Sequence, residues 1–252
     1  MNQREAVERF HLTFLRHFSA VVSPGTVSLK GGVNLRLYHN SSRLSEDMDF
    51  DARVVAVDTL KKNVKKVLGS KPLLTELAAV GITLSEIKPS KQTQTTQRWK
   101  FHVLFDVNDV PSRLEFSRRQ EEPFVGCVIG VPATALLALH QVQPFVFPHY
   151  TTTASYRQKV IALALRTQVQ SRDVFDLHHL AAFADAGKSL SREMTEKAIG
   201  QLRAITFEDF MGQVIPFLPV DLAAYYGTEA LWKTISDTVH ANLVTALPEE
   251  DT

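Results

Sequence analysis

One short stretch, residues 29–51, constrains this chain more than any other part of its sequence. It contains two glycines after an apolar-leaning run and two aspartates at the entry to a second apolar run: Gly31, Gly32, Asp47 and Asp49. If the intervening Met48 packs into a core as part of a strand, both carboxylates point to the opposite face, because side chains alternate across a strand. The stretch therefore predicts two carboxylates held side by side near a glycine turn.

Each half of this stretch suits one half of a magnesium–phosphate complex. Carboxylates held side by side repel each other unless a cation lies between them, and Mg²⁺ binds a few carboxylates together with substrate phosphates. Backbone N–H groups of Gly31 and Gly32 can approach a phosphate closely, and a helix starting near Val33 would direct its N-terminus at that anion. Lys30 and Arg36 are weaker candidates for phosphate contact. Either pair alone is more often a simple turn, so the combination carries the prediction.

The composition is that of a globular protein with a buried core. Of 252 residues, 44% are apolar and 22% are charged, and the net charge is only +1, so any contact with RNA or DNA must come from local patches. A single cysteine, Cys127, excludes an internal disulfide framework and a Cys-rich zinc site, and it fits a reducing compartment. The sequence shows no secretory signal and no apolar run long enough to span a membrane. We therefore expect a cytoplasmic protein.

The spacing of apolar residues predicts a mixed first part and a helical second part. Helices are expected at residues 4–22 and 57–68, and the polar run at residues 89–98 predicts an exposed hairpin tip. Strand alternation disappears after residue 127, which predicts domains at residues 1–130 and 131–252. The predicted strands cover residues 27–29, 48–57, 82–87, 99–107 and 113–117. Helix caps are predicted within residues 151–153 and at Ser191 and Thr206.

The strand predicted at residues 113–117 reads RLEFS and carries a further carboxylate. If its apolar residues face one side, Glu115 faces the other side together with Arg113. Taken alone, a glutamate beside an arginine on an alternating strand is most simply a surface residue. Asp106 competes with Glu115 for the role of third carboxylate.

A second candidate cluster lies in the helical half. A helix at residues 155–167 carries Lys159 beside its apolar face, and the segment SRDVFDLHHL follows it. Asp173 and Asp176 are three residues apart and would share one face of a helix that starts near Arg172. An aspartate in the first turn is also a routine cap, which is the simpler interpretation of Asp173 by itself.

Taken together, KGG-x-NLRL and RLSEDMDFD resemble the nucleotidyltransferase core of the AbiEii/AbiGii toxin group, within the DNA-polymerase-β-like nucleotidyltransferase superfamily. The Lys159 helix followed by R-D-x-x-D-L extends the resemblance to about residue 180. Gly31 and Gly32 stand where most of the superfamily has Gly-Ser, and Gln158 replaces the usual Glu. The resemblance implies an α+β fold, with a nucleotidyltransferase-type mixed β-sheet and flanking helices followed by a mainly helical C-terminal domain.

The resemblance also implies the transfer of a nucleoside monophosphate from an NTP to an acceptor hydroxyl. Asp47, Asp49 and Glu115 would hold one or two Mg²⁺ ions, and the glycine amides would cradle the triphosphate. Lys159, contributed by the helical domain, would neutralise charge on the β- and γ-phosphates. Asp173 would orient Lys159 or the acceptor hydroxyl, or assist proton removal.

The partners implied by the resemblance are an NTP, an acceptor and a cognate antitoxin, for a bacterial toxin of the abortive-infection type. Several such enzymes extend the 3′ end of tRNA, which makes tRNA the expected acceptor. Two basic segments are candidates for an RNA path: Lys61, Lys62, Lys65 and Lys66 form the first, and Arg118 with Arg119 forms the second. A solvated surface is the simpler interpretation of the first segment.

Two other functions stay open. The near-neutral charge is compatible with transfer to a small molecule or to a protein side chain. A degenerate nucleotidyltransferase fold that serves only as a binding module is also possible, although all the chemical groups listed above are present in the sequence.

Overall fold

The computed structural model describes residues 1–118 and 125–247, and it divides into two compact units. Unit 1 comprises Met1–Asn40 and Leu44–Tyr150, and unit 2 comprises Ser41–Arg43 and Thr151–Thr252. Arg119 of the predicted basic pair lies outside the described residues. The expected α+β class, a mixed sheet followed by a helical C-terminal part, is confirmed.

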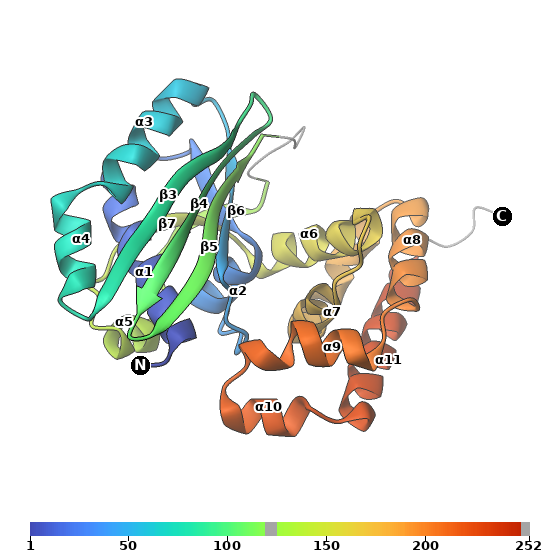
Figure 1. The fold of residues 1–252 in the computed structure, drawn as a ribbon. Coiled ribbons are helices and arrows are strands. Elements are labelled where there is room, and N and C mark those ends of the chain that lie inside the picture. Colours follow the sequence, from blue (N-terminus) through green and yellow to red (C-terminus); the bar gives the residue numbers. More distant parts are fainter. Residues whose placement is uncertain (119–124, 248–252) are drawn as a thin grey trace. The chain divides into compact units, whose positions relative to one another are not determined.

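Unit 1 alternates helices and strands (Figure 1). Its elements are α1 (Gln3–Ser19), β1 (Val27–Lys30), α2 (Gly31–Tyr38), β2 (Asp47–Ala52), α3 (Val57–Leu68), α4 (Lys71–Ala78), β3 (Ile82–Gln92), β4 (Thr96–Phe105), β5 (Asn108–Ser117), β6 (Cys127–Gly130), α5 (Thr134–Leu139) and β7 (Phe147–Tyr150).

The strands of unit 1 form one seven-stranded mixed sheet in the order β3-β4-β5-β2-β1-β7-β6. The central pairs are antiparallel β1–β2 and parallel β2–β5, so the chain crosses over between β2 and β5. This order places the strand that carries both predicted aspartates in the middle of the sheet, directly beside the strand that carries Glu115.

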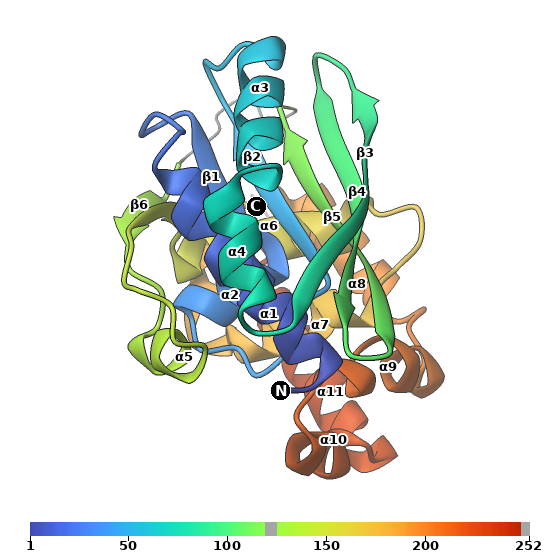
Figure 2. The same ribbon diagram turned by 60° about the vertical axis from the view of Figure 1, so that its left-hand side comes forward.

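One face of the sheet is covered by α1, α3 and α4, as Figure 2 shows. A capping box between Asn2 and Glu5 begins α1, and its phenylalanines recur every four residues. The ring of Phe18 lies 6.0 Å from that of Phe50 and 5.8 Å from that of Phe116. The apolar side chains of β2 and β5 are therefore buried under α1, and period-two alternation turns their polar side chains to the opposite face.

Three predicted features differ from the structure. The strand predicted at residues 48–57 ends at Ala52, and the polar tip at residues 89–98 shrinks to the turn between Gln92 and Thr96. The domain boundary lies after Tyr150 instead of after residue 130. The reason is β7, a four-residue strand containing Pro148, which pairs with β1 and β6 and so belongs to the sheet. Pairing with distant strands leaves no local pattern in so short a segment.

Unit 2 is helical around an apolar core that includes Tyr156, Leu177 and Trp232. Side-chain caps begin α6, α8 and α9 at Thr151, Ser191 and Thr206, as predicted. Its elements are α6 (Thr152–Leu165), α7 (Ser171–His179), η1 (Ala181–Ser189), α8 (Arg192–Leu202), α9 (Phe207–Gln213), η2 (Ile215–Phe217), α10 (Val220–Tyr226) and α11 (Glu229–Thr245).

Among residues 1–118 and 125–247, no helix has both the length and the apolar character needed to cross a bilayer.

The stacked pair in the centre of the sheet gives a test of the fold. Phe50 is fully buried, and its ring lies 4.5 Å from that of Phe116. We expect Phe50→Ala to lower the free energy of unfolding by about 3–5 kcal/mol, because it leaves a cavity under α1. Val107→Ala, at a side chain that is 91% exposed, should change it by less than about 0.5 kcal/mol. Equal urea midpoints for the two variants would contradict this packing.

Candidate functional site

The three predicted metal-binding carboxylates lie on one face of the sheet. Asp49 is in register with Glu115 across the parallel β2–β5 pair, and Asp47 lies two residues before Asp49 on the same side of β2. Met48 and Phe50 are completely buried on the other face. Alternation thus places Asp47 and Asp49 on one side of β2, as expected, and strand pairing adds Glu115 beside them.

Two of these carboxylates are neutralised by arginines from the neighbouring strands. An oxygen of Glu115 lies 2.6 Å from a guanidinium nitrogen of Arg98 on β4, its partner in register. An oxygen of Asp47 lies 3.0 Å from Nε of Arg113 on β5, also its partner in register. Both pairs are partly exposed, so the guanidinium groups can exchange partners at modest cost.

Asp49 is held differently, against the start of a helix. A Cβ atom on Gly31 would lie 3.1 Å from Oδ2 of Asp49, and Gly31 has φ +72°, a conformation that favours glycine. Gly31 is the first residue of α2, whose N-terminus favours a negative charge. Among the described residues, no ion pair or side-chain hydrogen bond engages the Asp49 carboxylate. A glycine, a helix N-terminus and an available carboxylate therefore meet at one point.

A further carboxylate on this face was absent from the predicted site. Asp51 is buried and continues the period-two series of Asp47 and Asp49. Its oxygens accept hydrogen bonds from Nζ of Lys30 at 2.5 Å and from the hydroxyl of Tyr150 at 2.8 Å. The sequence signal for Asp51 was available in DMDFD, and its partners show that Lys30 neutralises a buried charge.

Arg36, the other predicted phosphate contact, pairs with Glu8 of α1. Glu8 also lies 2.7 Å from Nε2 of His140, and its carboxylate is almost fully buried. Burial raises the pKa of Glu8, but the hydrogen bonds from His140 and Arg36 outweigh it and leave the pKa below its usual value. The guanidinium of Arg36 thus stabilises the packing of α1 on α2 in this arrangement.

Glu115 is favoured over Asp106 as the third carboxylate. Asp106 occupies the turn between β4 and β5 with φ 53°, at the far end of β5 from Glu115. Seven residues of strand between Asn108 and Glu115 span roughly 23 Å. Of these two carboxylates, Glu115 is the one in register with Asp49.

The predicted pair in unit 2 also meets. Nζ of Lys159 on α6 lies 2.9 Å from Oδ1 of Asp173 and 2.7 Å from Oδ2 of Asp176, both on α7. The two aspartates are fully buried. The sequence spacing correctly placed both on one face of a helix, and Asp176 proves as close to Lys159 as Asp173 is.

Two arginines complete this cluster, and sequence reasoning missed both. Arg43, in the short segment of unit 2 that precedes β2, donates to both oxygens of Asp176 at 3.0 and 2.8 Å. Nε of Arg166 donates to Oδ2 of Asp173 at 2.6 Å. No local pattern marks Arg43, because its partner is 133 residues away in the chain.

The cluster keeps both aspartates ionised. Burial raises the pKa of Asp173, but Lys159 and Arg166 lower it by more. Burial likewise raises the pKa of Asp176, and Arg43 and Lys159 outweigh that effect and hold it well below its usual range. Three cations face two carboxylates, so one positive charge is left over.

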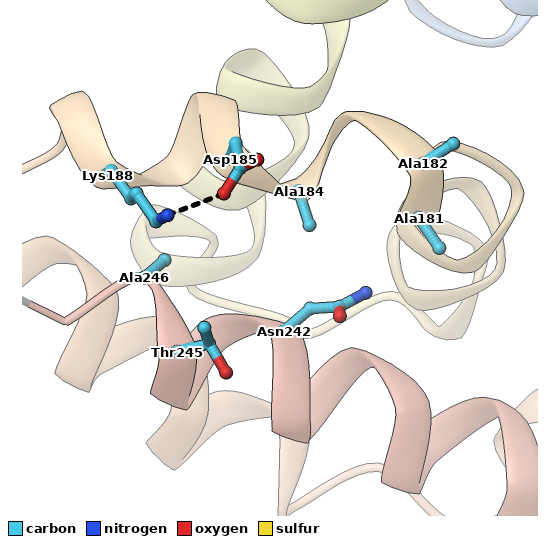
Figure 3. A pocket seen from close by; sticks show the side chains of 8 residues that line it. All are labelled: Ala181, Ala182, Ala184, Asp185, Lys188, Asn242, Thr245 and Ala246. Atoms are coloured by element: carbon cyan, nitrogen blue, oxygen red, sulfur yellow. Dashed lines mark ion pairs between the residues drawn. The ribbon is translucent and has the colours of Figure 1, made fainter.

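The predicted RNA-path residues and the pocket lie elsewhere. The α3 lysines are exposed, whereas Arg118 is half-buried and donates to Oε1 of Gln97 at 2.6 Å. A pocket of about 160 Å³ in unit 2 lies between η1 and α11, beside the Asp185–Lys188 ion pair, and contains none of the predicted site residues (Figure 3). In the part of the chain that the structure describes, no three His, Cys, Asp or Glu side chains are arranged to hold a metal ion.

Comparisons with known proteins agree with this geometry. The sequence model of the family "Nucleotidyl transferase AbiEii toxin, Type IV TA system" matches residues 13–222. A comparison with curated proteins gave no match. The structure of MenT4, a nucleotidyltransferase toxin from Mycobacterium tuberculosis, is similar with a TM-score of 0.61 at 16% identity, covering 99% of this chain and 87% of that one. JHP933 from Helicobacter pylori gives a TM-score of 0.59 at 17% identity, with 97% and 95% covered. These structural likenesses show the fold.

The contact between Gly31 and Asp49 can be tested with a matched glycine. Gly25 has φ +75° with nothing near its missing Cβ, whereas Gly31 has φ +72° and faces Asp49. Both alanine variants should lose roughly 1–2 kcal/mol of unfolding free energy to backbone strain. Gly31→Ala should lose more, because the carboxylate must move. Equal losses in urea unfolding would show that the contact is unimportant.

Acid should destabilise unit 2. Asp173 and Asp176 have pKa values below the unfolded value of about 3.9, so their stabilisation is complete above that pH and is lost as pH falls through the folded values. We expect the free energy of unfolding to fall as pH decreases from about 5 toward 2, and to fall less steeply in Asp176→Asn. Trp99→Phe leaves Trp232 as the only tryptophan, so its fluorescence reports unit 2.

The control for this titration is Asp185→Asn, which removes a carboxylate that is 87% exposed. This variant should keep the parent's pH dependence. A parent and an Asp176→Asn variant with the same slope would contradict the assigned pKa direction.

Proposed function

Because the chain belongs to the AbiEii nucleotidyltransferase toxin family of type IV toxin–antitoxin systems, we propose that it transfers a nucleoside monophosphate from an NTP to the 3′ end of tRNA with the help of Mg²⁺. The observation that carries the proposal is the meeting of Gly31, the N-terminus of α2 and Asp49, with Glu115 in register beside them. That arrangement joins an anion-binding backbone to a cation-binding carboxylate.

The acidic face offers the donor chemistry that Mg²⁺ prefers, but two of its carboxylates must first turn from their arginine partners toward Asp49. Asp47, Asp49 and Glu115 offer hard oxygen donors from two adjacent strands, and Asp49 has no side-chain partner among the described residues. The arginine partners of the other two carboxylates are partly exposed and have to release them for metal binding. When bound, Mg²⁺ would offset negative charge on the reacting phosphate and on the departing pyrophosphate.

The reaction is an in-line substitution at the α-phosphorus of the NTP. The acceptor hydroxyl oxygen forms a bond to that phosphorus, the bond to the bridging β-oxygen breaks, and pyrophosphate leaves while the hydroxyl proton passes to solvent. The glycine amides at the start of α2 bind the phosphates. Lys159 neutralises negative charge on the β- and γ-phosphates.

Asp173 acts by orienting Lys159. Its oxygens are occupied by Lys159 and Arg166, and its lowered pKa makes it a weak proton acceptor. Of the roles expected for Asp173 from the sequence, these contacts favour orientation over proton removal. Asp176 and Arg43 extend the same support, and Arg43 is close to Asp47 in the sequence.

In a cell, the proposed activity makes the protein a growth inhibitor controlled by a cognate antitoxin. Expression of the parent chain should slow growth, and Asp49→Ala should relieve the effect. A harmless parent chain would count against toxicity, whereas the transfer reaction is tested separately in vitro.

The transfer assay uses each labelled NTP with Mg²⁺ and total tRNA. We expect Asp49→Ala to lower the rate at least about a hundredfold, since a loss of roughly 3 kcal/mol of transition-state stabilisation has that effect. Asp109→Ala, at an exposed carboxylate paired with His102, is the control and should stay active. Lys159→Ala should raise the KM for NTP, because the phosphates lose a positive charge. Circular dichroism must show that unit 2 stays folded, because the variant leaves Arg43 and Arg166 as the remaining ion-pair partners of two buried aspartates.

The destination of the label decides among the possible functions. Label on tRNA supports the proposal. Label on protein or on a small molecule would show that the acceptor is not tRNA, and no label at all would support a binding module. Unchanged rates in both Asp49→Ala and Lys159→Ala would refute the assigned site.

A further inference from the structure

We propose that the acidic face of the sheet continues into a basic strip on β3, β4 and β5, and that this strip binds the phosphate backbone of the acceptor RNA. The basic strip is defined by five side chains: Lys88, Lys91, Arg98, Lys100 and Arg113. The inference rests on the proposed function in one respect, the choice of RNA as acceptor.

Strand register brings the strip beside the carboxylates in two rows. In the first row, Asp49 of β2 is opposite Glu115 of β5, Glu115 is opposite Arg98 of β4, and Arg98 is opposite Lys91 of β3. The row therefore changes from acidic to basic from the middle of the sheet to its β3 edge. Residues directly opposite each other point to the same face, so these four side chains share one side. The register of β3 shifts by one residue between Pro89 and Lys91, which is why Lys88 and Lys91, although three residues apart, both lie opposite residues on this face of β4.

The second row repeats the pattern one step along the strands. Asp47 is opposite Arg113, Arg113 is opposite Lys100, and Lys100 is opposite Lys88. Between the two rows, Trp99 is buried with its side chain on the α1 face, which confirms that Arg98 and Lys100 face the other way.

The strip is accessible and only partly neutralised. Lys88, Lys91 and Lys100 are exposed, and of the three only Lys88 has an ion-pair partner, Glu86, among residues 1–118 and 125–247. Arg98 and Arg113 pair with the site carboxylates and would turn to phosphate if Mg²⁺ replaced them. Since the whole chain carries a net charge of only +1, this local excess of positive charge marks a place for a polyanion.

The dimensions suit a short single-stranded end. Asp49 on β2 and Lys91 on β3 are the ends of a row across four adjacent strands, and the three spacings of about 4.8 Å give roughly 14 Å. At about 3.4 Å per nucleotide of a stacked strand, that length holds about four nucleotides. A 3′ end lying over the strip would bring its terminal hydroxyl to the carboxylates, as basic grooves do for other single-stranded nucleic acids.

The α3 lysines are less suited to this role. α3 packs with α1 on the covered face of the sheet, opposite the carboxylates (Figure 2). RNA bound there would have to pass around the sheet to reach Asp49. The strip shares its face with the carboxylates and needs no such detour.

The test measures binding of labelled total tRNA in EDTA without NTP, from about 50 to about 200 mM salt, so that catalysis plays no part. Lys91→Glu/Lys100→Glu should weaken binding at least about tenfold and reduce the slope of log affinity against log salt by about 2, one per lost phosphate contact. Lys91→Gln/Lys100→Gln should show a smaller loss. Lys197→Glu/Lys233→Glu makes the same change of charge on exposed lysines of unit 2 and should bind as the parent does.

Each outcome decides the inference. Loss of binding in the strip variants with retention in the control supports it. It is overturned if the strip variants bind as the parent does, if the control loses as much, or if the parent does not bind tRNA. The transfer assay is judged apart: a parent that binds tRNA through the strip but labels another acceptor would refute the proposed function alone. If the Lys91→Glu/Lys100→Glu variant labels tRNA as well as the parent does, the RNA-binding role of the strip is refuted, whereas the proposed function is not.

Discussion

Repulsion among carboxylates is the constraint on which the rest of this structure depends. Alternation along β2 buries Met48 and Phe50, and in doing so it forces Asp47, Asp49 and Asp51 onto one face of the sheet. Such a face is stable only if positive charge is supplied close by. Arg113 and Lys30 supply it to the outer two, and the N-terminus of α2 supplies a partial charge to Asp49.

The helical unit also holds two carboxylates close together, but in the buried interior instead of on a partly exposed face. Asp173 and Asp176 are fully buried, and the cost of removing them from water is offset only because Lys159, Arg43 and Arg166 surround them. The partly exposed arginine pairs on the sheet can exchange partners, whereas the buried cluster is fixed. The roles that we propose follow from this difference. The sheet binds a cation and the acceptor strand, and the buried cluster holds Lys159 in a fixed orientation.

Particular elements show where the sequence was sufficient. The alternation in DMDFD and RLEFS predicted that Asp47 and Asp49 share one face of their strand and that Glu115 faces away from Leu114 and Phe116, and burial agrees. That Glu115 joins the two aspartates was implied only by the family resemblance, and strand register places it opposite Asp49. The three-residue spacing of Asp173 and Asp176 predicted one helix face. The fold class and the family followed from the same motifs, and the family match confirms them. Lys30 and Arg36 were the weaker candidates for phosphate contact, and the sequence did not predict their partners in the structure, Asp51 and Glu8.

What the sequence determined by itself is every relationship set by the period of a single element: which side chains share a strand face, which share a helix face, and where glycine permits a left-handed turn. Tertiary structure decided what no local period contains, namely the strand order that makes Glu115 rather than Asp106 the neighbour of Asp49, the inclusion of β7 in the sheet, and the reach of Arg43 to Asp176. The physical reason is that alternation is fixed by bond geometry within a few residues, whereas pairing between distant segments depends on the packing of the whole core.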